Sequence, residues 1–235
     1  MPIINSQLKE HASSSQSRVI EYLDICEGSV IAVIGCGGKT SLMELLANKL
    51  QEKKVLVSTT TKMFPVKGIL CTGLLNEASG KLEALPPETL AGLIPQHDIT
   101  LLEADGSRGL PCKGWLPNEP AVPRYCTHTV GIVTMNVLGK TATETIVHRL
   151  PEFLSLTGLK EGETITAQAI EAMVCAPEGM FKNSAGKQYL LVNQAEDKTA
   201  AKTAHSFLQA IKEKYPFRFK KLLYGSVRQD TWNEV

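Results

Sequence analysis

Residues 30–50 of the chain read VIAVIGCGGKTSLMELLANKL, and this stretch predicts the fold around it. It begins with an apolar run, residues 30–34, that is long enough for a fully buried strand. A glycine-rich turn follows, and leucines at helical spacing up to Leu50 then predict a helix. A strand, a glycine loop, Lys-Thr and a helix is the order found in phosphate-binding loops. The stretch therefore predicts a nucleotide-binding α/β fold.

The turn supplies the groups that hold a phosphate. Glycines let several backbone N–H groups point at one spot, and the helix N-terminus adds the positive end of its dipole. Lys39 would reach the β- and γ-phosphates, and Thr40 would give its hydroxyl to Mg²⁺. The loop is shorter than the usual pattern, because only two residues separate Gly35 from Gly38. An ordinary strand-to-helix turn is the alternative. The predicted nucleotide-binding residues of the loop are Gly35, Cys36, Gly37, Gly38, Lys39, Thr40 and Ser41.

The composition is that of a folded protein with a sizeable core. The 235 residues suit a single α/β domain, residues 1–235, and an apolar content of 43% argues against disorder. A net charge of +1 implies no bulk attraction to nucleic acid or membrane. The sequence shows no signal peptide, no run long enough to cross a membrane and no C-x-x-C pair among its six cysteines. We therefore expect a cytoplasmic protein with reduced thiols.

Hydroxyl side chains end the next predicted strand. Residues 55–57 are apolar, and Ser58, Thr59, Thr60 and Thr61 follow them. Ligands of parallel sheets bind at the carboxyl ends of the strands. We therefore expect Thr60 and Thr61 to meet Mg²⁺ or the γ-phosphate. The alternative is a strand end that is rich in Thr for its β propensity.

A third predicted strand, residues 99–102, ends in carboxylates. Glu103 and Asp105 are two residues apart on the strand, so their side chains point the same way and could share one ion. Acids at this place bind Mg²⁺ or orient the nucleophile in phosphoryl transfer. Thr40, Glu103 and Asp105 are thus the predicted metal ligands. A surface turn is the alternative for Asp105.

Residues 106–126, which we call the flap, lack any periodicity and contain four prolines. Long loops of this kind inside compact domains are usually functional or disordered. Trp115, Arg108 and Lys113 favour an ordered, substrate-facing flap. We expect Arg108 and Lys113 to bind a second substrate or partner, with Arg108 joining Lys39, Glu103 and Asp105 as the catalytic residues. The alternative is that both are solvated loop charges.

The rest of the chain alternates between predicted strands and helices. We expect residues 134–187 to form a mainly helical insertion or subdomain. Within it, His148 and Arg149 could contact an anionic substrate, although a lone His is more often structural. Lys140 repeats the letters Gly-Lys-Thr without a glycine-rich approach, so it is not a second phosphate loop. The predicted strands are residues 68–72, 128–133, 188–192 and 220–224. The predicted helices are residues 15–25, a segment within 82–94 that starts late at Pro86-Pro87, 143–156, 166–174 and 199–215. Pro151 is expected to kink or divide the helix over residues 143–156.

Cys36 has two interpretations. A helix N-terminus lowers the pKa of a thiol, so Cys36 could be reactive and carry selenium or sulfur. The alternative, which we favour, is a small residue that the loop tolerates, because no second thiol is near it in sequence.

The motifs GCGGKTS, STTTK, LLEADGSRGLPCKGW, NEPAVP, VHR and LVNQAED, in this order, resemble the YqeC family. The resemblance extends from Val30 to Asp197, and its most specific part is Glu-x-Asp-Gly with the downstream Glu-Pro. It implies an accessory role in the maturation of selenium-dependent molybdenum hydroxylases. It also adds Glu119 to the predicted substrate or partner residues, which are Lys113, Glu119, His148 and Arg149.

Two further likenesses concern the nucleotide. The short loop with Glu103 is similar to the ATP site of Mur-type ligases. Asn193 and Glu196, in Asn-Gln-Ala-Glu, are similar to the guanine-reading Asn-Lys-x-Asp of GTPases, with Gln for Lys and Glu for Asp. Both residues are predicted to contact the nucleotide, and the choice between ATP and GTP stays open.

These observations predict a three-layer α/β fold of the P-loop type with a mostly parallel sheet. The expected function is Mg²⁺-dependent binding of a nucleoside triphosphate, with hydrolysis or phosphoryl or nucleotidyl transfer, in hydroxylase maturation. The rival is a nucleotide-gated chaperone that delivers a cofactor to the hydroxylase. Expected partners are the nucleotide and a molybdenum hydroxylase or its cofactor intermediate, without nucleic acid or membrane.

Overall fold

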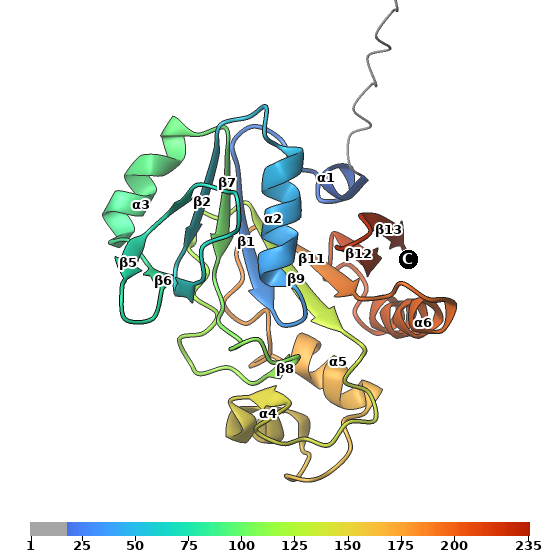
Figure 1. The fold of residues 1–235 in the computed structure, drawn as a ribbon. Helices are drawn as coiled ribbons and strands as arrows, with labels where there is room; N and C mark the ends of the chain where they lie inside the picture. Colours follow the sequence, from blue (N-terminus) through green and yellow to red (C-terminus); the bar gives the residue numbers. More distant parts are fainter. Residues whose placement is uncertain (1–17) are drawn as a thin grey trace, which may run out of the picture.

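The computed structural model describes residues 18–235, and its centre is an eight-stranded sheet (Figure 1). All neighbouring strands are parallel except at one edge, where the last pair is antiparallel. The predicted α/β class with a mostly parallel sheet is therefore confirmed. The strand order is β13 (Thr231–Glu234), β12 (Lys221–Ser226), β11 (Lys187–Asn193), β9 (His128–Thr134), β1 (Ser29–Gly35), β7 (Ile99–Glu103), β2 (Val55–Thr59) and β4 (Cys71–Thr72).

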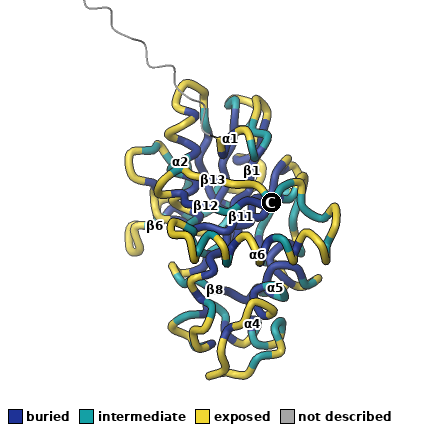
Figure 2. Tube along the Cα trace, turned by 90° about the vertical axis from the view of Figure 1, so that its right-hand side faces the viewer, coloured by how far each residue is buried: buried dark blue, intermediate teal, exposed yellow. Residues whose placement is uncertain are grey.

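The central strand β1 is buried on both faces because its residues are all apolar or small. Ile31 and Val33 pack into one core, and Ala32 and Ile34 pack into another on the opposite face. Helices cover both faces, and in Figure 2 the tube is dark blue, and so buried, along the central strands β1 and β11. One core includes α1 (Arg18–Tyr22) and α2 (Lys39–Lys49), and the other includes α3 (Pro87–Leu93), α4 (Leu150–Thr157), α5 (Ala167–Cys175) and α6 (Lys198–Lys214).

Parallel pairing brings the predicted site segments to one edge of the sheet. Val33 pairs with Glu103, Gly35 with Ile132, and Asn193 with Thr134. The carboxyl ends of β7, β1, β9 and β11 thus lie in adjacent positions, with the glycine turn between β1 and α2 among them. This edge is where ligands of open α/β sheets bind.

Short strands outside the main sheet hold the loops in place. A three-stranded antiparallel sheet contains β3 (Lys62–Met63), β6 (Lys81–Glu83) and β5 (Leu74–Asn76). In the flap, β8 (Cys112–Lys113) pairs in parallel with β10 (Val147–His148). A 3₁₀ helix, η1 (Ile94–Gln96), follows α3. The two-residue strands are too short to produce a periodic pattern, so the sequence gives no sign of them.

The prediction of a helix over residues 143–156 is wrong in its first half. Residues 147–148 form β10, and α4 begins only at Leu150. Arg149 stops any earlier helix, because its φ of 58° lies in the left-handed region. Pro151 stands in the first turn, where a proline is tolerated. It therefore starts the helix and does not divide it.

The other expected elements are close to the observed ones. The helix expected over residues 15–25 is α1, and residues 15–17 lie outside the described residues. The strand expected over residues 68–72 is shorter, as β4. Thr166 caps α5, because its hydroxyl accepts a hydrogen bond from Ala169 N at 3.2 Å. Within residues 18–235, no helix has the length and apolarity to span a bilayer.

Candidate functional site

The turn between β1 and α2 follows a path that only glycine permits. Gly37 and Gly38 have φ values of 106° and 132°. A Cβ atom on Gly38 would lie 2.5 Å from Asn193 Nδ2, and one on Gly35 would lie 2.4 Å from the Ile132 carbonyl oxygen. Both approaches are closer than real Cβ contacts. A larger residue at either position would collide with these atoms, so glycine allows the loop to pass between Ile132 and Asn193.

The loop leaves a row of backbone N–H groups without an acceptor. Within the described part of the chain, the N–H groups of residues 37–41 donate no hydrogen bond, whereas Gly35 N bonds Asp105 and Cys36 N bonds Ile132. Residues 39–41 form the first turn of α2, where N–H groups have no partner inside the helix. No acidic side chain lies in this turn. The row is at the positive end of the helix dipole and has the chemistry to bind an anion.

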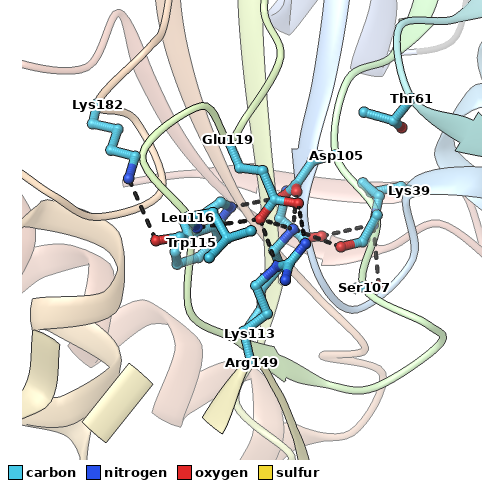
Figure 3. A network of polar contacts seen from close by, with 12 residues as sticks. Lys39, Thr61, Asp105, Ser107, Lys113, Trp115, Leu116, Glu119, Arg149 and Lys182 are labelled. Carbon is cyan, nitrogen blue, oxygen red and sulfur yellow. Dashed lines mark hydrogen bonds and ion pairs between the residues drawn. The ribbon is translucent and has the colours of Figure 1, made fainter. Parts of the chain in front are cut away.

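Lys39 folds back over the loop. Its Nζ donates to the Gly35 carbonyl oxygen at 2.7 Å and to Ser107 Oγ at 3.2 Å (Figure 3). The side chain is buried, yet it lines the cavity described below. An ammonium group has three donors, so one remains for another acceptor. The loop thus has a fixed positive charge beside its free N–H groups.

Glu103 ends β7 opposite the start of α2. Thr40 Oγ1 donates to Glu103 Oε2 at 3.4 Å. Burial raises the pKa of Glu103 above its ordinary value, and the charge of Lys39 and the Thr40 hydrogen bond oppose that rise. Thr59 Oγ1 donates to the Glu103 carbonyl and lies 3.4 Å from Thr61 Oγ1. Residues 18–235 hold no group of three His, Cys, Asp or Glu side chains that could bind a metal.

Asp105 lies in a different environment from the one expected. Its side chain is fully buried, and Oδ2 accepts hydrogen bonds from Gly35 N at 3.1 Å and from Trp115 Nε1 at 2.9 Å. Oδ1 accepts from Lys113 Nζ (Figure 3). The carboxylate thereby connects the glycine loop between β1 and α2 to the flap. Metal ligation by Asp105 stays a prediction, and both oxygens already have protein partners.

Lys113 is fully buried, and its charge continues the network. Its Nζ lies 3.2 Å from Glu119 Oε2 and donates to the Gly106 carbonyl. Arg149 donates two hydrogen bonds of 2.8 Å to the Glu119 carboxylate, one from Nε and one from a terminal nitrogen. Burial would raise the pKa of Glu119, but Arg149 and Lys113 hold it below its ordinary value. Lys113 thus acts inside the flap, and its expected contact with a substrate stays a prediction.

A cavity of about 960 Å³ brings many of the predicted residues together. Thr60 lies apart from it and ties β2 to the flap, because its hydroxyl donates to the Ala121 carbonyl at 2.7 Å. Asp105 and Lys113 do not line it, and Lys113 contacts two residues that do, Gly106 and Glu119. The predicted residues that line the cavity are Gly37, Gly38, Lys39, Thr40, Ser41, Thr61, Glu103, Arg108, Glu119, His148 and Arg149.

A second cavity, of about 570 Å³, adjoins the loop at Gly38 and Ser41. Asn193 lines it and connects the glycine loop to the segment after β12. Its Nδ2 donates to the Gly37 carbonyl, and its Oδ1 accepts from Val227 N, both at 2.8 Å. Glu196 also lines it, and Glu196 Oε1 accepts a hydrogen bond from Ser226 at 2.7 Å. The end of β11 therefore lies beside the glycine loop, and the contact of Asn193 and Glu196 with a nucleotide stays a prediction.

The structure favours the second interpretation of Cys36. The residue is fully buried, and burial raises the pKa of its thiol to about 12. Cys112 packs in the same core and is also buried, with its pKa raised by burial. Neither thiol is a thiolate near neutral pH.

Ser107, Gln194 and Lys81 are among the cavity residues that the sequence analysis did not predict. Ser107 follows Glu-Ala-Asp-Gly, and a hydroxyl just beyond a strand end was a usable signal. Gln194 lies within Asn-Gln-Ala-Glu and accepts hydrogen bonds from Thr134 and Asn136. Lys81 comes from β6, far from the loop in sequence, so no local pattern marks it.

Comparison with known proteins gives one family. The family model described as "YqeC protein" matches residues 31–71 and 66–151. A protein of Escherichia coli (strain K12), named "Uncharacterized protein YqeC", is 35% identical over 181 residues, which are 66% of this chain and 71% of that relative. No solved structure matches the chain.

Proposed function

The chain belongs to the YqeC family, and from that premise we propose that it is a Mg²⁺-dependent nucleoside-triphosphate-binding protein. One observation carries the proposal. The unbonded N–H groups of residues 37–41, the ammonium of Lys39 and the carboxylate of Glu103 line one cavity. N–H groups at a helix start favour phosphate, and a nearby lysine neutralises its charge. Together they form the recognition set of a phosphate-binding loop.

The residues at the loop also fit a magnesium ion. The Thr40 hydroxyl and the Glu103 carboxylate lie within 3.4 Å of each other at the cavity wall. Mg²⁺ prefers oxygen ligands and is usually held by one or two protein groups together with phosphates and water. Thr40 and Glu103 would hold the ion. When bound, it would supply charge neutralisation for the phosphates.

The base would lie in the cavity that Asn193 and Glu196 line. Asn193 is already occupied by Gly37 and Val227, so it orients the loops. Glu196 has one oxygen, Oε2, without a donor among the described residues. A carboxylate accepts hydrogen bonds, and guanine offers an N–H and an amino group on one edge, whereas adenine offers one amino group. This chemistry favours GTP over ATP.

The reaction would be hydrolysis or transfer of a phosphoryl or nucleotidyl group. Such chemistry depends mainly on positioning and charge neutralisation, which Lys39 and the N–H row supply. The resemblance to the YqeC family suggests a role in maturing selenium-dependent molybdenum hydroxylases, and we propose that role for this chain.

A specific observation favours a second candidate, the nucleotide-gated chaperone. Phe64, Leu70, Leu74 and Leu75 expose between 53% and 89% of their surface, and all come from one segment beside the cavity. Phe64 itself lines the cavity. Exposed apolar side chains that gather at a surface favour partner binding, and this segment offers several of them. A nucleotide bound next to it could control access to a protein.

A thermal-shift panel tests the proposal. ATP, GTP, CTP and their diphosphates are added with Mg²⁺ or with a chelator. A ligand at about a hundred times its dissociation constant stabilises the folded state by about 2.7 kcal/mol, which for a chain of this size raises Tm by about 5–10 °C. We expect a Mg²⁺-dependent rise, largest for GTP. A Tm that no nucleotide changes would contradict the proposal. A phosphate-release assay then distinguishes the two candidates. An enzyme hydrolyses the nucleotide on its own, whereas the chaperone hydrolyses it only when its partner is present.

A further inference from the structure

The larger cavity extends well beyond the phosphate loop. Its remaining wall comes from the flap, from β10 and its flank, and from the segment around β3 and β6. We call this part the flap-side compartment. The lining residues that bear on its ligand are Arg108, Leu110, His148, Arg149, Phe64 and Lys81. The two cavities share Gly38, Ser41 and Gln194, so a nucleotide with its base in the smaller cavity leaves the flap-side compartment free.

The flap-side compartment carries more basic than acidic side chains, and two of the basic ones form no ion pair among the described residues. Two acids line the larger cavity: Glu103 at the glycine loop, which attracts Lys39 and Lys81, and Glu119, whose carboxylate Arg149 and Lys113 already bind. Arg108 and Lys81, in contrast, form no ion pair within residues 18–235. Burial lowers the pKa of His148, and the charges of Lys113, Arg149 and Arg108 lower it further against the opposing charge of Glu119. Several cations therefore act on one imidazole, which marks a site of positive potential.

The backbone holds the two arginines in unusual conformations. Arg108 has a φ of 51° and Arg149 a φ of 58°, in a region where glycine would be unstrained. Strain of this kind clusters at functional sites. The Arg149 side chain is fixed by Glu119, whereas Arg108 is exposed and its guanidinium is available. Arg108 is thus a planar, bidentate donor without an assigned acceptor.

Apolar side chains complete the compartment. Leu110 and Pro111 line it on the flap, and Met63 and Phe64 line it from β3 and its flank. Lys81 Nζ lies 4.7 Å from the centre of the Phe64 ring. A ligand that fits this wall has an apolar body next to its charged group.

We propose that the flap-side compartment binds a second substrate that is an organic oxyanion, a phosphate ester or carboxylate on an apolar body. The guanidinium of Arg108 binds the oxyanion through two hydrogen bonds, and Lys81 adds a point charge beside it. The inference rests on the proposed function only in that the nucleotide occupies the neighbouring loop. The site is built from residues that the loop does not use.

Phenyl phosphate and benzoate are suitable probes, because they share an aromatic body and differ in the oxyanion. Ligand-observed NMR measures their binding in two settings that block the phosphate loop. One is wild type saturated with Mg²⁺ and a non-hydrolysable GTP analogue, and the other is Lys39→Ala without nucleotide. Arg108→Gly is the main variant, because glycine adopts this backbone without strain. Arg108→Lys keeps the positive charge but loses the two parallel N–H donors of the guanidinium. Arg124→Gly, an exposed arginine of the flap that lines neither cavity, is the matched control.

We expect a probe to bind in both settings, Arg108→Gly to weaken it about tenfold or more, and Arg108→Lys to fall between. Arg124→Gly should stay within about twofold of wild type, as expected for an exposed charge outside the site. Binding of phenyl phosphate alone identifies a phosphate ester, and binding of benzoate alone a carboxylate. Binding that disappears when the loop is blocked, that Arg108→Gly leaves unchanged, or that neither probe shows overturns the inference. Arg108-dependent binding in a protein that binds no nucleotide would refute the proposed function and leave the oxyanion site standing.

Discussion

The buried carboxylate of Asp105 allows two assignments to be separated by one substitution. As a metal ligand, Asp105 would affect the Mg²⁺ dependence of nucleotide binding and contribute little to folding. As the centre of the loop-to-flap network, it would contribute to stability, because its side chain and that of Lys113 are fully buried. Asp105→Asn keeps the shape and removes the charge. The measured quantity is the free energy of unfolding.

The magnitude follows from the contacts. Removing one partner of a buried ion pair costs about 3–5 kcal/mol, because the other charge stays buried. Lys113 keeps Glu119 at 3.2 Å and the Gly106 carbonyl, so we expect a loss near the lower limit, about 3 kcal/mol. Asparagine also offers one acceptor oxygen where Gly35 N, Trp115 Nε1 and Lys113 Nζ all donate.

Urea unfolding, followed by tryptophan fluorescence and circular dichroism, measures the loss. Asp105→Asn, Lys113→Met and the double variant form a thermodynamic cycle, and the coupling energy should exceed about 1 kcal/mol. Glu178→Gln is the control. It breaks the Glu178–Lys182 pair, in which Glu178 is 80% exposed, and should leave the midpoint unchanged. If Asp105→Asn unfolds like wild type, or the single losses simply add, the structural assignment of Asp105 is refuted.

Other predictions concern the loop and the base cavity. The pKa of Glu103 is raised in the folded protein, so the native state holds this proton to a higher pH than the unfolded chain, and stability falls as pH rises through the window above 4.5. Glu103→Gln should therefore be more stable than wild type at about pH 8 but not at about pH 4 in urea titrations, and the reverse order would contradict the burial argument. Thr40→Val should weaken the Mg²⁺ dependence of nucleotide binding about tenfold in titrations of the metal, and an unchanged curve would remove Thr40 from the metal site. Glu196→Ala should reduce any preference for GTP over ATP by about tenfold in competition binding, and a preserved preference would place base reading elsewhere.

Much of the fold could be predicted because its central elements carry strong local signals. The run Val30-Ile31-Ala32-Val33-Ile34 is wholly apolar, as a strand covered on both faces must be. The glycines and Lys39 that follow specify the turn into α2. The carboxyl ends of the later strands had to meet this turn, since parallel pairing brings them to one edge. These features follow from the spacing of apolar residues along the chain and from the parallel pairing of the strands.

The wrong or incomplete predictions have local causes too. The apolar period continues through residues 143–156, and nothing in it shows that Arg149 takes a left-handed conformation. For Asp105, the sequence indicates a carboxylate near the loop but not what it faces. Its partners, Lys113 and Trp115, are in a flap without periodicity, and β8 positions them by pairing with β10. Long-range pairing of two-residue strands leaves no pattern in the sequence.

The central claim is that the loop binds a nucleotide through Lys39, and calorimetric titration tests it most directly. Lys39→Ala is compared with wild type and with Lys140→Ala, an exposed lysine that also stands between Gly and Thr. Charge-assisted hydrogen bonds to phosphate contribute about 1.5–3 kcal/mol, so Lys39→Ala should weaken Mg²⁺–nucleotide binding about tenfold or more while Lys140→Ala binds like wild type. Equal affinity of Lys39→Ala and wild type would contradict the account and make the loop an ordinary turn.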